Sequence, residues 1–518
     1  METVTITKAE YEAQQTQIRE LTGQVQYLME QLRLSKHRQF GSSSEKSEYD
    51  FGQLNLFNDA EVFADANVVE PELCEVEKHY RKRTMLTTDK LPEDLPVEVV
   101  EHKLPPEEQI CPECNGELHV MGKEVRRELK LIPAKAVIVE HVKYVYACRD
   151  CERDSYGVPI IKAPMAESVI KGSFASPEAV AYIMTQKFVM GVPLYRQEQE
   201  WKRQGILLSR QTMSNWLLRC SEDWLEPIYG ALREIMLTYS SALHADETTL
   251  QVLREPGKAA QTKSYMWLYR TSGYNRHGAK TPTPIVLCDY QPDRKALRPR
   301  EFLGGWSGYL HTDGYAGYHA LPEDIVIVGC MAHARRKFDE ALKGIAEKDR
   351  QGSGALIGKR YCDKLFAIEQ ELKDLSPEDR YLKRQEQAKP VLDEFWSWLE
   401  KQHLVKNAFG KAVQYMLDQW KYLVQYLEEG QLEISNNRAE RSIKPFVIDR
   451  KNFLFANTPR GARASAVIFS IIETAKENQL DPYAYLTYIF QRAPNLDIRN
   501  PSHLDLLMPY SFKTADKG

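Results

Sequence analysis

The 518-residue chain is too long for one hydrophobic core and is 43% hydrophobic, so several domains are expected. Its formal net charge of -4 at pH 7 excludes a globally basic protein, and any affinity for nucleic acid must come from local patches. No run of about 18 apolar residues occurs and no signal-peptide pattern opens the chain, so we expect a cytoplasmic protein without a membrane-spanning helix.

Apolar residues recur at spacings of three and four through residues 11–32. This pattern predicts a short coiled-coil helix within residues 1–47, although an amphipathic helix docked on its own domain has the same pattern. Residues 48–104 follow as a linker. Their first part, residues 48–77, contains many acids and no Lys or Arg, which is typical of an acidic segment without a packed core.

Four of the nine cysteines form two Cys-x-x-Cys pairs within residues 105–165, and residues 137–148 between them alternate as in a β-strand. Two such pairs can hold a tetrahedral zinc ion through four thiolates, which leaves no position for water and makes the site structural. A redox dithiol or unrelated core cysteines are the alternatives. The predicted zinc ligands are Cys111, Cys114, Cys148 and Cys151.

Residues 170–235 have helical periodicity. Ser176 and Ser209 have the chemistry of helix N-caps, and Gly205 lies in a short turn between two helices, so this region is a helix-turn-helix candidate. Plain packing of a helix pair is the alternative. Basic residues on these helices suit contacts with DNA phosphates. The candidate DNA contacts are Lys202, Arg203 and Arg210.

Residues 240–341 alternate as strands. In "SALHADETTLQVL" this alternation places Asp246 and the neighbouring Glu247 on opposite faces, so only one of them can point into a given site. Asp313 ends a second strand, in "GYLHTDGY", with the same His-x-Asp arrangement. A long helical stretch follows, over about Arg335–Glu429.

A further helix is expected to begin at Ser435 and to end at Pro445. It places Glu440 one turn after Asn436, so that the two side chains share a face. Each acid alone has an ordinary explanation, as a turn residue, a strand-end acid or a surface ion-pair partner. Together, two strand-borne aspartates and one helix-borne glutamate are the ligands that two Mg²⁺ ions need for phosphoryl transfer.

Five stretches in this order, with the acidic residues inside them, closely resemble the transposases of the insertion-sequence-sixty-six family. They are "HADETTLQV", "GYLHTDGYAGY", "GCMAHARRKF", "ISNNRAERSIKPF" and "ETAKENQLDPYAYL", behind "FGSSSEKS" and the four-cysteine module. The family consists of DDE transposases with a ribonuclease H-like core. The resemblance implies that the catalytic triad is Asp246, Asp313 and Glu440.

The resemblance implies a multidomain α+β protein with a ribonuclease H-like α/β core over residues 236–460. A helical insertion would occupy about residues 342–430 of this core, and residues 461–518 would form a C-terminal helical region. Asn436 would support the site. Cys330 and His333 form a Cys-x-x-His step that looks like one found beside the active site of several DDE families, although a buried thiol and a capping histidine fit equally.

The implied activity is Mg²⁺- or Mn²⁺-dependent cleavage and joining of DNA, with two metal ions in each active site and Arg336 as a candidate phosphate contact. The zinc module and the helix pair would bind the terminal inverted repeats of an insertion sequence, and the coiled coil would pair protomers. Accessory proteins of the element are further implied partners, and the implied location is the bacterial cytoplasm, in association with the nucleoid. A DNA-binding regulator with an inert core and a nuclease without strand transfer are the alternatives.

Overall fold

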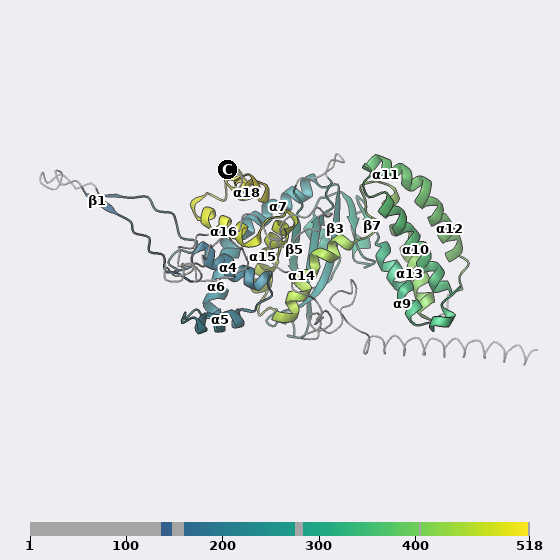
Figure 1. The fold of residues 1–518 in the computed structure, drawn as a ribbon, viewed down its shortest axis with the longest axis horizontal. Helices are drawn as coiled ribbons and strands as arrows, with labels where there is room; N and C mark the ends of the chain where they lie inside the picture. Colours follow the sequence, from purple (N-terminus) through teal and green to yellow (C-terminus); the bar gives the residue numbers. More distant parts are fainter. Residues whose placement is uncertain (1–135, 148–159, 275–282, 404–405, 516–518) are drawn as a thin grey trace, which may run out of the picture. The chain divides into compact units, whose positions relative to one another are not determined.

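The computed structural model describes residues 136–147, 160–274, 283–403 and 406–515, which fall into two units that divide after Ala163. The predicted coiled coil, the acidic linker and the four predicted zinc ligands lie outside the described residues. In the smaller unit, β1 (Val145–Ala147) pairs antiparallel with β2 (Ile160–Lys162) (Figure 1). The sequence predicts a longer strand here, but hydrogen-bonded pairing covers only these three residues.

The described part of the larger unit is built on a five-stranded mixed sheet in the order β5-β4-β3-β6-β7 (Figure 1). β3 is central, because it pairs antiparallel with β4 on one side and parallel with β6 on the other. β5 continues the antiparallel half and β7 the parallel half. The strands, all predicted, are β3 (Ala242–Gln251), β4 (Lys263–Thr271), β5 (Val286–Gln291), β6 (Gly308–His311) and β7 (Ile325–Val328).

β4 is buried along most of its length because apolar side chains leave both of its faces. Trp267 and Tyr269 are fully buried, and Tyr269 stacks on Phe302 of α8 (Leu297–Leu303) with ring centroids 3.8 Å apart. Edge strand β5 is covered by helix α15 (Pro459–Glu477), whose Ser470 hydroxyl accepts the N–H of Cys288 at 2.7 Å. These contacts keep the edge from pairing with another chain.

The helices before the sheet begin where the sequence predicts. Ser176 accepts a hydrogen bond from the N–H of Ala179 at 3.1 Å, and Ser209 accepts one from Thr212 at 3.1 Å, so both serines are N-caps. Gly205 has a φ of 78°, which allows the tight turn between the second and third helices. The elements are α4 (Pro177–Phe188), α5 (Leu194–Arg203), α6 (Arg210–Cys220), the π-helical turn η3 (Ser221–Leu225) and α7 (Glu226–Tyr239).

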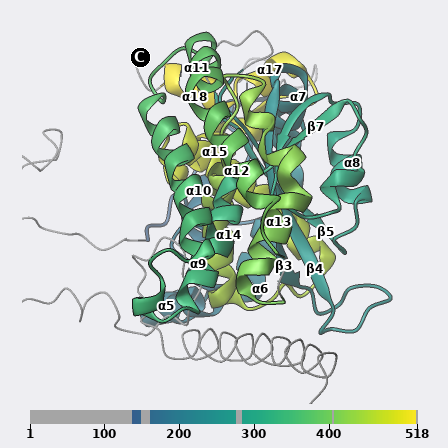
Figure 2. The ribbon, with the colours of Figure 1, turned by 90° about the vertical axis from the view of Figure 1, so that its right-hand side faces the viewer.

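Between β7 and the next long helix the chain is helical, as predicted, and has a second hydrophobic core. Figure 2 shows these helices side by side. Phe338 and Phe395 are fully buried in this core, and Val328 at the end of β7 joins it to the sheet. The elements are α9 (Met331–Lys343), η5 (Glu347–Asp349), α10 (Gly354–Glu371), α11 (Pro377–Lys383), η6 (Arg384–Ala388), α12 (Lys389–Leu399), α13 (Ala408–Leu423) and η7 (Gln425–Leu427).

Helix α14 (Asn437–Phe453) corrects the prediction that Pro445 ends it. Pro445 lies inside the helix and removes the hydrogen bond to the carbonyl of Arg441, but that residue is exposed, so water can reach the carbonyl. Phe446 is buried and meets Phe469 of α15 edge-to-face, with ring centroids 5.3 Å apart. Tertiary packing of the second half thus outweighs the local cost of proline.

The C-terminal part is helical, as predicted, and a new helix begins after Asp481. Asp481 caps the new helix by accepting the N–H of Ala484 at 2.7 Å. No helix within the described residues has the length and apolar character to cross a bilayer. The remaining elements are η4 (Tyr318–Ala320), α16 (Pro482–Arg492), η8 (Ala493–Asn495), α17 (Pro501–Asp505) and α18 (Pro509–Ala515).

Candidate active site

Asp246 lies in the middle of the central strand β3, in register with Leu268 of β4. One of its carboxylate oxygens accepts the N–H of Glu247 at 2.8 Å. Asp246 has no ion-pair partner within the described part of the chain. Burial, followed by the charges of Glu247, Asp313 and then Glu440, raises the pKa of Asp246 well above its usual range. A carboxylate among other carboxylates, with no cation beside it, is a group that a metal ion would stabilise.

Glu247 points to the other face of the strand and has a different environment. Its side chain is 1% exposed and accepts hydrogen bonds from Arg294 Nε at 2.6 Å and from the hydroxyl of Tyr318 at 2.5 Å. Arg294 also lies 3.9 Å from the carboxylate of Asp313 and over the ring of Tyr315. These contacts agree with the alternation predicted from sequence. The charge of Glu247 is already compensated by Arg294.

Asp313 follows Thr312, the first residue after β6, and β6 is the parallel neighbour of β3. Its Oδ1 accepts the N–H of Tyr315 at 2.9 Å, which fixes the turn after the strand. Because β3 and β6 are parallel neighbours, Asp246 in β3 and Asp313 just after β6 lie near one another. Their electrostatic interaction follows from this placement.

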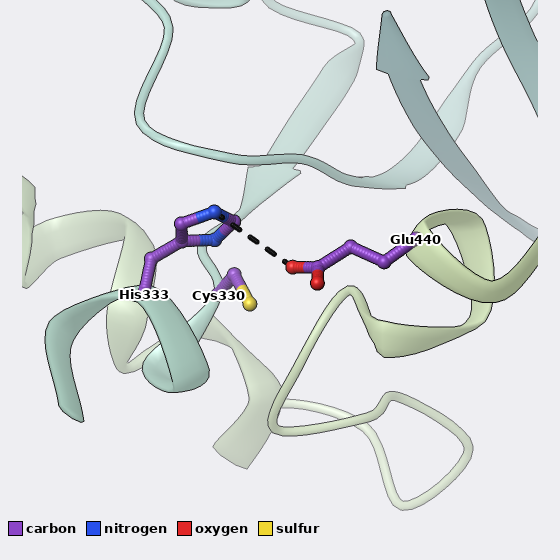
Figure 3. A group of neighbouring side chains, drawn as sticks. All are labelled: Cys330, His333 and Glu440. Carbon is purple, nitrogen blue, oxygen red and sulfur yellow. Dashed lines mark ion pairs between the residues drawn. The ribbon is translucent and has the colours of Figure 1, made fainter. Parts of the chain in front are cut away.

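Glu440 comes from α14 and points toward α9 (Figure 3). Its Oε1 lies 3.7 Å from His333 Nε2, and its Oε2 lies 3.3 Å from Arg336 Nη2. Cys330, His333 and Glu440 each offer a ligand atom within 4.8 Å of the others. The carboxylates of Asp246, Asp313 and Glu440 do not form so tight a group in the described residues.

The two His-x-Asp sequences have a shared structural role. His244 and His311 lie in register on β3 and β6, and their rings stack with centroids 4.2 Å apart. His244 Nδ1 donates to Asn436 Oδ1 at 3.0 Å, and Asn436 Nδ2 donates to the carbonyl of Ala245 at 2.7 Å. Burial lowers the pKa of both histidines well below the usual range. A neutral, buried network thus ties both strands to the start of α14.

Cys330 and His333 belong to this arrangement through α9. The backbone N–H of Asn436 donates to Cys330 Sγ at 3.1 Å, and burial raises the pKa of this thiol to about 11. Burial also lowers the pKa of His333, against the opposing charge of Glu440. Cys330 is therefore a protonated thiol at neutral pH, and its observed role is to hold the N-terminus of α14.

Two kinds of donor set meet at this edge of the sheet. The oxygens of Asp246 and Asp313 fit hard cations such as Mg²⁺ or Mn²⁺, whereas the sulfur and nitrogen of Cys330 and His333 are donors that zinc also accepts. Glu440 lies with Cys330 and His333, within 4.8 Å of their ligand atoms. The uncompensated carboxylate of Asp246 favours a divalent cation on the oxygen side.

The three predicted DNA contacts lie on the surface of α5 and α6. Lys202, Arg203 and Arg210 are all exposed. Arg203 pairs with Glu200 at 2.7 Å, and the backbone N–H of Arg210 donates to Glu198 at 2.9 Å. None of the three is packed inside the protein, so all are accessible to a ligand.

Sequence reasoning missed two features of the site. The pairing of Glu247 with Arg294 and Tyr318 joins segments distant in the chain, and no local pattern indicates it. Tyr415 of α13 reaches the turn after Asp313: a Cβ built on Gly314 would lie 2.9 Å from the Tyr415 hydroxyl. The glycine after Asp313 was the only sequence signal that another group approaches there.

Fold and site together define an α+β protein with a mixed sheet and an acidic site formed by Asp246 within β3 and Asp313 just after the neighbouring strand β6. Residues 172–464 match the family described as Transposase IS66 family. The chain belongs to this family of DDE transposases. Residues 108–152 match the zinc-finger binding domain of transposase IS66, residues 27–100 match Transposase C of IS166 homeodomain, and residues 470–510 match the IS66 C-terminal element.

The chain is also similar to uncharacterized proteins of Sinorhizobium fredii (strain NBRC 101917 / NGR234). It is 30% identical to y4hP over 424 residues, which cover 78% of this chain and 74% of that protein. It is 29% identical to y4jD over 424 residues, which cover 80% of each chain. The similarity thus extends over most of both relatives.

Proposed function

We propose that this protein cleaves DNA at the ends of an insertion sequence and joins the resulting 3′-hydroxyl to target DNA. The observation that carries the proposal is Asp246, a carboxylate on the central strand with acids nearby and no ion-pair partner among the residues that the structure describes. The family match supports the same chemistry. The order of the sheet, with an antiparallel hairpin on one side of β3 and parallel strands on the other, supports a ribonuclease H-like core.

In this proposal Asp246, Asp313 and Glu440 hold two divalent metal ions. When bound, such ions activate the attacking oxygen and stabilise the leaving oxygen of an in-line phosphoryl transfer. The stacked histidines and Asn436 fix the two strands and α14 relative to one another. In this proposal Glu440 turns from His333 and Arg336 toward the two aspartates.

The zinc module, proposed to hold Zn²⁺ through its four cysteines, and the α4–α7 region are proposed to bind the terminal inverted repeats. The predicted N-terminal coiled coil is proposed to pair two protomers across two DNA ends, and accessory proteins of the element are further candidate partners. Within the chain, we propose the domain limits given by the sequence: 1–47, 48–104, 105–165, 170–235, 236–460 and 461–518.

Strand joining is the result that tests the enzymatic function. The full-length protein, incubated in Mg²⁺ with the DNA ends that flank its own gene and a supercoiled plasmid, should yield flanking-end strands covalently joined to the plasmid through their 3′ ends. Sequencing of the junctions is the measurement. Cleavage without joined product would instead identify a nuclease, and binding without cleavage a DNA-binding regulator with an inert core.

The contribution of α5 and α6 should appear as a change in salt dependence. Replacing Lys202, Arg203 and Arg210 with Gln should weaken binding to the end DNA and reduce the slope of log K against log salt by about 0.9 for each lost phosphate contact. The control replaces three exposed lysines of the insertion with Gln and should leave the slope unchanged. An unchanged slope in the first variant would place the DNA-binding surface elsewhere. The control residues are Lys364, Lys373 and Lys383.

A further inference from the structure

The insertion helix α13 brings a tyrosine to the proposed catalytic edge. The side chain of Tyr415 packs against Gly314, the residue after Asp313. A Cβ at Gly314 would lie 2.9 Å from both the hydroxyl oxygen and Cε2 of Tyr415, so this approach requires glycine. The insertion, although distant in the sequence, therefore reaches the turn that carries Asp313.

The surroundings of Tyr415 are positively charged on the side of α9. Lys337 Nζ lies 4.8 Å from the centre of the tyrosine ring. Burial, with smaller effects of Cys330 and Asp313, raises the pKa of Tyr415 well above its usual range, while Arg336 acts in the opposite direction. Like any protonated tyrosine, Tyr415 offers its hydroxyl as a donor.

The Tyr415 hydroxyl differs from the other tyrosine hydroxyls around Asp313. Tyr318 donates to Glu247, and Tyr315 donates to the backbone carbonyl of Arg294. Tyr415 makes no hydrogen bond to any residue that the structure describes, although its side chain is partly buried. A partly buried donor beside an acidic site and two basic side chains is suited to an anionic ligand.

We infer that Tyr415 contacts the substrate. Its hydroxyl donates a hydrogen bond to a nonbridging oxygen of the reacting DNA phosphate, which is bound in the acidic site beside Asp313. The inference rests on the proposed function, because it requires DNA at the acidic site. Phosphate oxygens are strong acceptors, and Arg336 and Lys337 add positive charge on the same side. The insertion thereby supplies part of the active site as well as a second core.

Tyr415→Phe tests this contact because it removes the hydroxyl and keeps the ring against Gly314. On ordinary end DNA, single-turnover cleavage in Mg²⁺ should slow by about 10- to 100-fold, the loss expected for one hydrogen bond to a charged group. The thermal midpoint should not change. Tyr426→Phe is the matched control, since Tyr426 is another tyrosine of the insertion whose hydroxyl has no partner in the described residues, and it lies against Arg384. It should cleave at the wild-type rate.

DNA with a single sulfur at one nonbridging oxygen of the reacting phosphate identifies the contacted atom. With the isomer that carries sulfur at the contacted oxygen, the wild-type protein should cleave only slightly faster than Tyr415→Phe. With the other isomer, the ratio of the two cleavage rates should be the same as on ordinary DNA. If the variant were slowed equally on ordinary DNA and on both sulfur-substituted isomers, the hydroxyl would support the protein structure without contacting the phosphate, and the inference would be overturned. Cleavage of ordinary end DNA by Tyr415→Phe at the wild-type rate would also overturn the inference.

The same experiment separates this inference from the proposed function. If the wild-type protein cleaves and Tyr415→Phe is unaffected, the substrate contact is wrong and the proposed function stands. If the wild-type protein does not cleave in Mg²⁺ or Mn²⁺, the proposed function fails, and the inference about Tyr415 fails with it.

Discussion

Asp246→Asn should lower the rate of DNA cleavage and joining by about 1,000-fold or more, because even residues that only support metal ligands cost 10- to 100-fold when replaced. The fold should tolerate this change. Burial and neighbouring acids already disfavour the charge of Asp246, and no protein cation depends on it. We therefore expect a thermal midpoint in metal-free buffer at or above that of the wild-type protein.

Mg²⁺ provides a second measurement for the same variant. An ion that binds only the folded protein raises the thermal midpoint as the concentration of the ion rises. The wild-type protein should show this increase and Asp246→Asn should show little of it. Asp313→Asn and Glu440→Gln should resemble Asp246→Asn in both assays.

Glu247→Gln is the control within the same strand. The Glu247 side chain is 1% exposed and bonded to Arg294 and Tyr318. Alanine would leave a cavity, whereas glutamine keeps the shape: its amide oxygen can accept from Arg294 and its amide N–H can donate to the Tyr318 hydroxyl, although the negative charge is lost. Its cleavage rate should stay within about tenfold of wild type, the loss of one ordinary hydrogen bond. A Glu247→Gln protein that is folded but as inactive as Asp246→Asn would refute the assignment of Asp246 to the metal site.

Cys148→Ser should abolish zinc binding by the four-cysteine module. A four-thiolate site is closed, and structural zinc contributes about 10–16 kcal/mol of apparent binding free energy in small zinc domains, so loss of one ligand should remove most of the folding energy of the module. We expect about one zinc per wild-type chain and almost none in the variant, by metal analysis of reduced protein. Binding to the end DNA should weaken in parallel.

Cys74→Ser is the matched control for the zinc prediction. Cys74 lies outside both Cys-x-x-Cys pairs, so this variant should retain its zinc. A Cys148→Ser protein that kept a full complement of zinc would show that the two pairs do not share one ion. Zinc lost equally from both variants would point to general damage by the cysteine substitutions.

Local patterns were sufficient for the elements of the core and for the faces of its central strand. Period-2 alternation separated Asp246 from Glu247, and cap chemistry located the helix starts at Ser176 and Ser209. These features depend on neighbours in sequence, which is why they could be predicted. Pro445 was misleading because its local cost is outweighed by distant packing of Phe446 against Phe469.

Contacts between distant segments could not be derived in this way. Nothing near Glu247 in sequence indicates Arg294, and nothing near Asp313 except its glycine indicates Tyr415. The His-x-Asp repeat was visible, but its meaning depends on the register of two parallel strands, which brings His244 onto His311. Register is a property of the assembled sheet.

The sequence by itself determined the identity of the acidic residues, their order along the chain and the strand face from which Asp246 points. The tertiary structure alone decided which charges surround each acid. Within the described residues Asp246 has no ion-pair partner, Glu247 is paired with Arg294, and Glu440 is paired with Arg336 and lies beside His333. Electrostatic energy depends on distance in space and on burial, and both arise only when strands, insertion and α14 come together.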